Sequence, residues 1–244
     1  MDILRSALLW VGGIIIILVF FPVSFIIWLI VLPFDKDRRV IHRILIWQSR
    51  LSIMLIPVKS FRSEGREKAV KGTTYVLISN HQSILDILYV NTLGYRCKWI
   101  SKVENKKIPI MGWYLSMADY IPVDRGNEES KIIMLEKSLS CLKNGTSIMI
   151  FPEGTRSKNG ETGFFKRGAF QLAIEAGVPI LPIVLDGTGG ILPKHGLIFG
   201  TGHDVKVKVL DPVLPRDFGT DNPDELALKF SSIIKEELTG LRKK

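Results

Sequence analysis

The sequence predicts an α/β protein in which a mixed, largely parallel sheet is flanked by helices and preceded by a hydrophobic and amphipathic helical membrane anchor. Three observations support this fold class. Residues 7–34 are wholly uncharged, and residues 36–71 are strongly basic. From Thr73 onward, short apolar segments typical of strands alternate with segments typical of helices. Such alternation indicates a sheet with helices packed on its faces.

The apolar segment at residues 7–34 holds 28 residues without one charged side chain. As a helix it measures roughly 42 Å, which exceeds the ~30 Å hydrocarbon core of a bilayer. Pro22, near its middle, is expected to kink or interrupt the helix. Two interpretations stay open: a single tilted or kinked helix that spans the membrane, or a hydrophobic hairpin that remains in one leaflet.

The basic segment at residues 36–71 carries +7 of the total net charge of +9. A basic cluster directly after a hydrophobic segment indicates the cytoplasmic side and favours an anionic lipid surface. We therefore expect residues 1–60 to anchor the chain in the inner (cytoplasmic) membrane, with the catalytic domain on its cytoplasmic face. Residues 40–57 are amphipathic and either lie on the membrane or pack on the following domain. Nucleic acid is excluded as a partner because the cations lack interleaved aromatic side chains.

The polar stretch 61–72 is expected to be a linker, and residues 73–244 the α/β domain. The expected strands are Tyr75–Ser79, Lys98–Ser101, Tyr120–Val123, Ser147–Phe151, Ile180–Leu185 and Val205–Leu210. The expected helices are Ile84–Leu93, Ile110–Met117, Ser130–Leu142, Phe165–Ala176 and Asp224–Leu238. The last strand alternates apolar and polar residues, as an edge or antiparallel strand does. Pro182 inside a strand requires an edge or a bulge.

A histidine and an aspartate follow the first expected strand, within residues 80–86 (Asn-His-Gln-Ser-Ile-Leu-Asp). Ser83 and Asp86 have the form of a capping box, which is a purely structural explanation of Asp86. With Ser83 as the N-cap, His81 and Asp86 converge at the helix N-terminus. A histidine beside a carboxylate is the base half of a nucleophilic triad. Because the chain has no G-x-S-x-G motif, a substrate hydroxyl is expected to attack directly.

Two further polar clusters follow expected strands. Residues 151–157 (Phe-Pro-Glu-Gly-Thr-Arg-Ser) form a tight turn at the carboxyl end of a strand, where ligands bind in open α/β sheets. Arg156 in this turn can clamp a phosphate with two hydrogen bonds. Residues 120–126 form a strand followed by the charged pair Asp124-Arg125. The structural alternatives are an ordinary polar turn and a surface ion pair.

These clusters together resemble the glycerolipid acyltransferase superfamily, and specifically the bacterial lysophosphatidate acyltransferases of the PlsC type. The blocks that carry the resemblance occur in the family's order between residues 75 and 187. They are His81-x4-Asp86 with Asn80 and Ser83, Asp124-Arg125, Phe151–Ser157, and the proline-containing strand around Pro182.

The resemblance implies an enzyme, a 1-acylglycerol-3-phosphate O-acyltransferase of phospholipid synthesis. Such an enzyme transfers a fatty acyl group from acyl-CoA or acyl carrier protein to the sn-2 hydroxyl of lysophosphatidate and forms phosphatidate. The resemblance further implies that His81 is the general base, that Asp86 orients it, that no covalent acyl-enzyme forms, and that neither a metal nor a bound cofactor takes part. The implied substrate-binding residues are Arg125, Glu153, Gly154, Thr155, Arg156, Lys102 and Lys107. The implied supporting residues are Asn80, Ser83 and Pro182.

Among the implied roles, Arg125 and Arg156 bind the phosphate, and Glu153 bonds the glycerol moiety or an arginine. Two other functions stay open. One is a related acyltransferase with another glycerolipid or lysolipid as its acceptor. The other is a lipid-binding scaffold on the same fold, which the intact His81 and Asp86 disfavour. The donor type and the oligomeric state are left open by the sequence.

Overall fold

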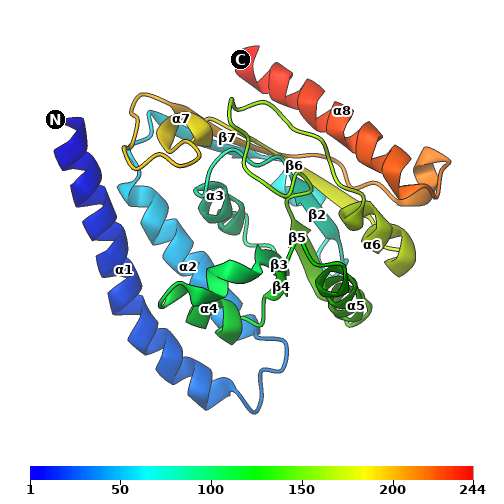
Figure 1. The fold of residues 1–244 in the computed structure, drawn as a ribbon, viewed down its shortest axis with the longest axis horizontal. Helices are drawn as coiled ribbons and strands as arrows, with labels where there is room; N and C mark the ends of the chain where they lie inside the picture. Colours follow the sequence, from blue (N-terminus) through cyan, green and yellow to red (C-terminus); the bar gives the residue numbers. More distant parts are fainter. Residues whose placement is uncertain (244) are drawn as a thin grey trace.

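Seven apolar or alternating segments pair into one sheet in the computed structural model, which describes residues 1–243 (Figure 1). The strands are β1 (Ser60–Glu64), β2 (Val76–Ser79), β3 (Cys97–Lys102), β4 (Ile121–Val123), β5 (Ser147–Ile150), β6 (Ile180–Asp186) and β7 (Asp204–Val209). They lie in the order β1-β7-β6-β2-β5-β3-β4. Only the β6–β7 pair is antiparallel. The predicted mixed, largely parallel sheet is confirmed.

Helices cover both faces of this sheet. The α-helices are α1 (Asp2–Val31), α2 (Arg39–Leu55), α3 (Asp86–Thr92), α4 (Met111–Met117), α5 (Glu128–Lys143), α6 (Gly168–Ala176), α7 (Thr188–Ile191) and α8 (Pro223–Lys243). Short 3₁₀ helices are η1 (Arg66–Lys68), η2 (Val103–Lys107) and η3 (Pro215–Phe218). Figure 1 shows α2, α3 and α4 on one side of the sheet and α5, α6 and α8 on the other.

Two apolar cores lie on the two faces because successive side chains of a strand point to opposite sides. In β2, Leu77 belongs to the core beneath α2 and α3, whereas Val76 and Ile78 belong to the core beneath α5, α6 and α8. All three side chains are at most 1% exposed. Strand β2 is therefore buried on both faces, and the residues that follow it are held rigidly in the middle of the sheet.

The stretch expected to be a linker, residues 61–72, supplies most of β1, which pairs with β7 in parallel. The hydroxyl of Ser60 also donates to a carboxylate oxygen of Asp204 at 2.6 Å. The sheet thus begins at residue 60, and the boundary expected at residue 73 is too late. The polar composition reflects an edge strand, which is exposed on one side. Strand β7 is antiparallel to β6, as expected, and β1 covers its outer edge.

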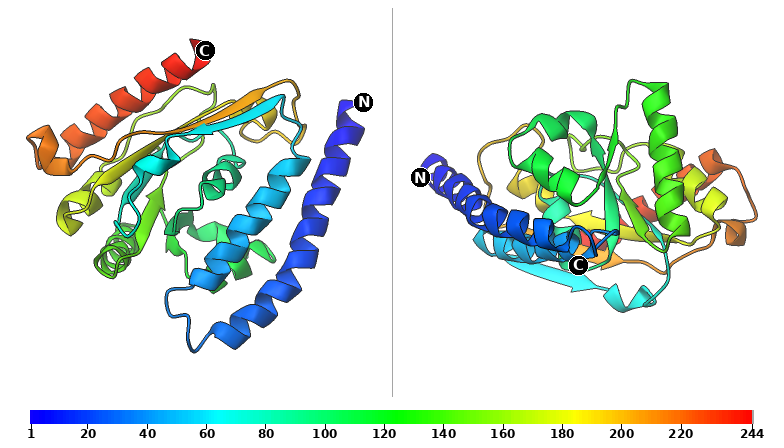
Figure 2. Two further views of the ribbon diagram at one scale, coloured as in Figure 1. Left: turned by 180° about the vertical axis from the view of Figure 1, so that it is seen from behind. Right: turned by 90° about the horizontal axis from the view of Figure 1, so that it is seen from below.

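The long apolar segment forms one continuous helix, α1, of 30 residues. The helix continues through Pro22 without interruption, so the single-helix alternative is the one found, and residues 7–31 do not fold back as a hairpin. A proline removes only one hydrogen bond of such a helix. By length and composition α1 is able to cross a membrane, and most of its apolar surface is exposed. Figure 2 shows it running alongside α2.

Helix α2 has a buried and an exposed face. Ile41 and Ile46 are at most 8% exposed, and Ile41 packs in the core on the sheet side, where α2 contacts α3. Trp47 and Met54 are 61% and 79% exposed. The alternative in which residues 40–57 pack on the following domain is therefore confirmed for one face. The opposite face keeps the apolar and aromatic character that suits a membrane surface.

Candidate active site

The polar clusters identified in the sequence meet at the carboxyl edge of the central parallel strands. Strands β2, β5 and β6 are neighbours in the sheet and run in the same direction. Their carboxyl ends therefore bring residues 80–86, 151–157 and 186–190 together. This edge is where open α/β sheets bind their ligands.

Asn80 fixes the loop after β2 to the neighbouring strand. Its side-chain amide donates to the carbonyl oxygen of Leu185 at 2.7 Å and accepts from the N–H of Leu185 at 2.9 Å. The amide is buried, and it continues the pairing of β2 with β6 by one more residue. Asn80 thus holds His81 in place and does not itself face a ligand.

His81 and Asp86 form a hydrogen-bonded pair. The Nδ1 atom of His81 lies 2.8 Å from Oδ2 of Asp86, whose side chain is fully buried. The carboxylate also accepts from the N–H groups of Gln82 at 2.6 Å and Ser83 at 2.9 Å, and from the hydroxyl of Thr188. Because the carboxylate only accepts hydrogen bonds, Nδ1 carries the imidazole proton. The Nε2 atom of His81 is left with a lone pair to accept a proton.

The imidazole of His81 is also fixed in its plane. It stacks on the ring of Phe151 with 3.8 Å between centroids and 5° between planes, and Trp99 packs behind Phe151 at 5.5 Å. Its side chain is 15% exposed. A ring held by stacking and by one carboxylate keeps one tautomer and one orientation, which a general base requires.

Only one of the two hydrogen bonds of the expected capping box forms. The Asp86 carboxylate reaches back to the N–H of Ser83, but the Ser83 hydroxyl donates to the carbonyl of Leu192 at 2.6 Å. Helix α3 begins at Asp86 and its N-cap is Leu85, so Ser83 is not the N-cap. The reason is that the buried carbonyl of Leu192 also needs a donor. Capping alone does not explain Asp86, because its other partners are His81 and Thr188.

Thr188 is a member of this site that the sequence reasoning missed. Its side chain is fully buried and its hydroxyl donates to Asp86 Oδ1. The signal that points to it is its position two residues after the end of β6, the same place that the other two clusters occupy after β2 and β5. It positions Asp86, and through it His81.

Glu153 bonds backbone N–H groups of the site, and its expected bond to the glycerol moiety stays a prediction. Its carboxylate is 7% exposed and accepts from the N–H of His81 at 2.8 Å and from the N–H of Gly163 at 3.0 Å. Burial raises the pKa of Glu153 to about 7, although the two N–H donors oppose the shift. Among residues 1–243, no arginine donates to its oxygens, and the side chain is largely shielded from solvent. Glu153 therefore holds the backbone of His81, which is a positioning role.

A cluster of cations lies on the β3–β4 side of His81. The guanidinium of Arg125 donates to the carbonyl of Gly154, whose φ of +68° favours glycine. Glu104 has a lowered pKa, first because of its hydrogen bond from Lys102 and further because of the nearby charge of Lys107. The charge of Glu104 also acts on Arg125. Arg125 thus reaches the turn after β5 at Gly154, whereas Lys102 pairs with Glu104 at 2.9 Å, and the expected substrate contacts of Lys102 and Lys107 stay predictions.

Arg156 and Thr155 lie in the same turn but differ in their partners. Arg156 is half-buried, and its guanidinium has no hydrogen-bond partner among residues 1–243. It is therefore free to bind an anion. The Thr155 hydroxyl accepts from Lys194 at 2.8 Å and so is directed toward the loop after α7.

Pro182 lies in the interior of β6, away from this edge, and its predicted bulge is present. Between the Ile180–Val213 bridge and the Ile183–Val209 pair, β6 advances by three residues and its partner by four. The extra residue lies opposite Pro182, which has no N–H to offer a ladder. Pro182 therefore shapes the sheet and does not line the site.

Residues 60–186, slightly more than half of the chain, match a family model described as Acyltransferase. The chain belongs to this acyltransferase family. The matched region holds all the blocks that carry the predicted resemblance, which is confirmed at the level of the family.

Curated relatives share this part of the chain. The 1-acyl-sn-glycerol-3-phosphate acyltransferase LPAT1 (chloroplastic) of Arabidopsis thaliana is 43% identical over 186 residues, which are 75% of this chain and 51% of that protein. Its counterpart BAT2 (chloroplastic) of Brassica napus is 39% identical over 186 residues, 75% of this chain and 53% of its own. The chain spans about half the length of these relatives.

A solved acyltransferase structure matches the whole fold. The 1-acyl-sn-glycerophosphate acyltransferase PlsC from Thermotoga maritima superposes with a TM-score of 0.82 at 26% identity, over 100% of this chain and 99% of that one. The likeness therefore includes α1 and α2 as well as the sheet.

Proposed function

We propose that this acyltransferase moves a fatty acyl group from an acyl thioester to the sn-2 hydroxyl of 1-acyl-glycerol-3-phosphate and so forms phosphatidate. The observation that carries the proposal is the His81 imidazole, whose Nδ1 is held by buried Asp86 at 2.8 Å while Nε2 keeps its lone pair. The curated relatives named above are 1-acyl-sn-glycerol-3-phosphate acyltransferases, which supports this acceptor.

The attacking group is the hydroxyl of the acceptor, not a side chain of the protein. Burial raises the pKa of the Cys97 thiol to about 12, and burial also raises the pKa of Cys141. Neither cysteine is therefore a thiolate near neutral pH. The Ser83 hydroxyl is committed to the carbonyl of Leu192. A base without a protein nucleophile favours direct transfer without an acyl-enzyme.

The reaction then follows from the position of the base. Nε2 of His81 takes the proton of the acceptor hydroxyl as its oxygen attacks the thioester carbonyl carbon. Asp86 stabilises the imidazolium that forms. The tetrahedral intermediate collapses, the carbon–sulfur bond breaks, and the imidazolium returns its proton to the leaving thiolate. Every proton moves through His81, so the proposed cycle needs neither a metal nor a bound cofactor.

The oxyanion of the intermediate needs N–H donors that are not already in use. Gln82 and Ser83 direct their N–H groups to Asp86, and the N–H of Gly154 donates to Phe151. Within the described chain, the N–H groups of Thr155 and Arg156 have no acceptor. We assign the oxyanion to this part of the turn after β5.

The phosphate of the acceptor is assigned to Arg125 and Arg156. Replacing Arg156 with alanine is expected to raise the KM for lysophosphatidate about 10- to 100-fold, as for a lost charged hydrogen bond, with a smaller change in kcat. The phosphate is bound alike in the ground and transition states, which is why KM carries the effect. Steady-state kinetics with varied acceptor measure it.

Arg216→Ala is the matched control, because Arg216 is exposed in η3 and has no ionic partner among residues 1–243. We expect its kinetics to equal those of the wild type. If Arg156→Ala changed only the KM of the acyl donor, Arg156 would be assigned to the wrong substrate.

The membrane location follows from the same proposal. Acceptor and product are both lipids, and α1 together with the exposed face of α2 presents an apolar surface beside the site. We infer that the chain is held at the inner (cytoplasmic) membrane with the site on the cytoplasmic face, where the basic residues 36–71 meet anionic lipid.

The test of the proposed function is an acceptor panel with the purified full chain. One acyl donor is offered with lysophosphatidate, glycerol 3-phosphate, a lyso-ornithine lipid and an uncharged monoacylglycerol. We expect lysophosphatidate to be acylated fastest. Fastest transfer to another lysolipid would move the function to a related acyltransferase, and no transfer to any acceptor would favour the lipid-binding scaffold.

A further inference from the structure

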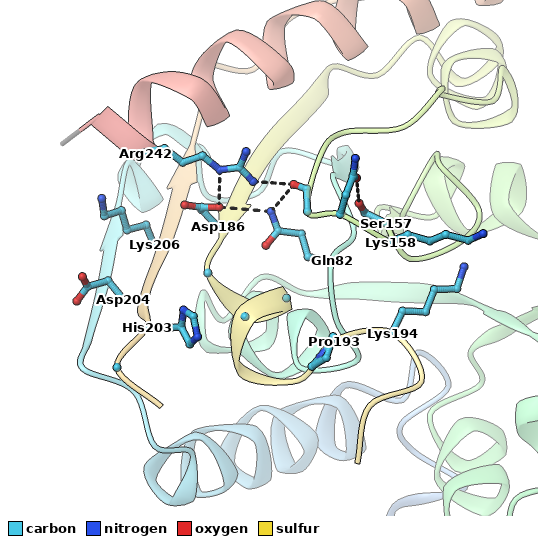
Figure 3. Close-up of a pocket in the computed structure, with 16 residues that line it drawn as sticks. Gln82, Ser157, Lys158, Asp186, Pro193, Lys194, His203, Asp204, Lys206 and Arg242 are labelled. Atoms are coloured by element: carbon cyan, nitrogen blue, oxygen red, sulfur yellow. Dashed lines mark hydrogen bonds and ion pairs between the residues drawn. The ribbon is translucent and has the colours of Figure 1, made fainter. Parts of the chain in front are cut away.

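A polar cleft of about 600 Å³ lies beside His81, on the side of β6 and β7 (Figure 3). Its walls are the loop at residues 157–160, the turn at residues 186–190, the start of β7 and the last turn of α8. None of the substrate-binding residues predicted from the sequence lines it. It therefore needs an explanation of its own.

The cleft lies next to the loop that carries the catalytic pair. Gln82, the residue after His81, lines it and donates to the carbonyl of Gly160 at 3.1 Å. Ser157, on the facing wall, donates its N–H to the carbonyl of His81 at 2.7 Å. Figure 3 shows Gln82 between Asp186 and the loop that carries Ser157. The cleft is thus adjacent to the backbone of His81.

The cleft carries uncompensated positive charge. Lys158, Lys194 and Lys206 line it, and none of them has a carboxylate partner among residues 1–243. Lys206 donates to the carbonyl of Leu241 at 2.6 Å. Three cations without carboxylates around one opening favour an anion.

The two carboxylates of the cleft are already engaged. Asp186 pairs with Arg242 at 3.1 Å. Asp204 accepts from Ser60 at 2.6 Å and lies 3.6 Å from Lys59. Asp186 is balanced by Arg242, and Asp204 is shared by Lys59 and Lys206, so Lys158 and Lys194 keep the opening positive.

Glycines let the turn after β6 pack closely against residues 203–204 at the floor of the cleft. A Cβ atom at Gly187 would lie 1.9 Å from the carbonyl oxygen of Asp204, and one at Gly190 would lie 2.6 Å from the His203 ring. The backbone at Gly187 also has a φ of +91°. No side chain fits at these two positions, and the floor is backbone.

The cleft extends from the loop after β5 toward β6 and β7. Strand β2, which directly precedes His81, has β5, β3 and β4 on one side and β6, β7 and β1 on the other. Arg125 follows β4 and Arg156 follows β5, whereas the cleft is bounded by residues 157–160, which come directly after Arg156, by the ends of β6 and β7, and by α8. A transfer between two substrates needs two anchoring sites that converge on one base.

We propose that this cleft binds the phosphate-bearing arm of the acyl donor, the phosphopantetheine thioester that acyl-CoA and acyl carrier protein share. This inference rests on the proposed function, in which Arg125 and Arg156 hold the acceptor. The lysines attract the donor's phosphates, and the thioester end reaches His81 past Gln82 and Ser157. The cleft thereby separates donor from acceptor.

The test uses the full chain with Lys158→Glu and Lys194→Glu together, and separately with Lys206→Gln. The donors are acyl-CoA, acyl carrier protein and S-acyl-N-acetylcysteamine, which keeps the thioester but has no phosphate. We expect the KM for a phosphate-bearing donor to rise at least tenfold in the double variant. The KM for S-acyl-N-acetylcysteamine and for lysophosphatidate should stay within twofold of the wild type. Lys235→Glu, an exposed residue of α8 outside the cleft, is the control.

A rise with only one of the two phosphate-bearing donors supports the inference and identifies the donor that the cleft accepts. An unchanged donor KM in both variants, or an equal rise with the phosphate-free donor, would overturn it. If the wild type acylates an acceptor other than lysophosphatidate, the proposed function fails. The assignment of the cleft to the donor then still holds if the donor KM, measured with that acceptor, rises in the variants.

Discussion

The variant His81→Ala is expected to lose about 10²- to 10⁴-fold in kcat, because it removes the only group placed to take the proton of the acceptor. Its fold should persist, since the backbone N–H that bonds Glu153 is retained in alanine. The measurement is kcat of the purified protein, together with its thermal unfolding midpoint.

His195→Asn provides the matched control for this variant. His195 is exposed and has a φ of +66°, a conformation that asparagine tolerates. We expect its kcat to equal that of the wild type. Full activity in a folded His81→Ala protein would remove His81 from the mechanism.

The variant Asp86→Asn is expected to lower kcat about 10²- to 10⁴-fold, comparable to the loss of the base itself. The carboxylate accepts from His81, Gln82, Ser83 and Thr188, and an amide has only one oxygen for these donors. The amide N–H₂ must therefore face a donor, or His81 must adopt the other tautomer, with its lone pair at Nδ1. Steady-state kinetics and chemical denaturation measure the two consequences.

We expect the same substitution to cost about 1–3 kcal/mol of unfolding free energy, because it leaves a buried donor without an acceptor. Asp217→Asn, at an exposed position of η3, is the control and should change neither quantity. An Asp86→Asn protein with wild-type kcat would show that Asp86 only caps α3.

The sequence predicts the His81–Asp86 pair better than it predicts the residues that hold this pair in place. His81 and Asp86 lie five residues apart at a strand–helix junction, so local spacing is enough to bring them together. The partners of Glu153 are the N–H groups of His81 and Gly163, and the first of these is 72 residues distant. No local pattern shows that contact. Thr188 is likewise joined to Asp86 only by the pairing of β2 with β6.

In the fold, too, the sequence predicts features that depend on local residues and misses those that depend on distant contacts. Alternation of apolar segments predicts a largely parallel sheet, because each strand buries its own apolar residues. The strand Ser60–Glu64 is exposed and polar, and it becomes a strand only through its pairing with β7. Composition therefore suggests a linker where tertiary pairing makes an edge strand. Pro22 is a similar case, since a helix as long as α1 tolerates the loss of one hydrogen bond.

The central claim is direct acyl transfer to the sn-2 hydroxyl of lysophosphatidate with His81 as the base. Its most direct test is mass spectrometry of the purified full chain incubated with 1-acyl-glycerol-3-phosphate and a donor whose acyl chain differs in mass. We expect phosphatidate that carries the donor's chain at sn-2, and a protein whose mass is unchanged at every time. Acyl groups attached to the protein during turnover, or donor consumption without phosphatidate, would contradict it.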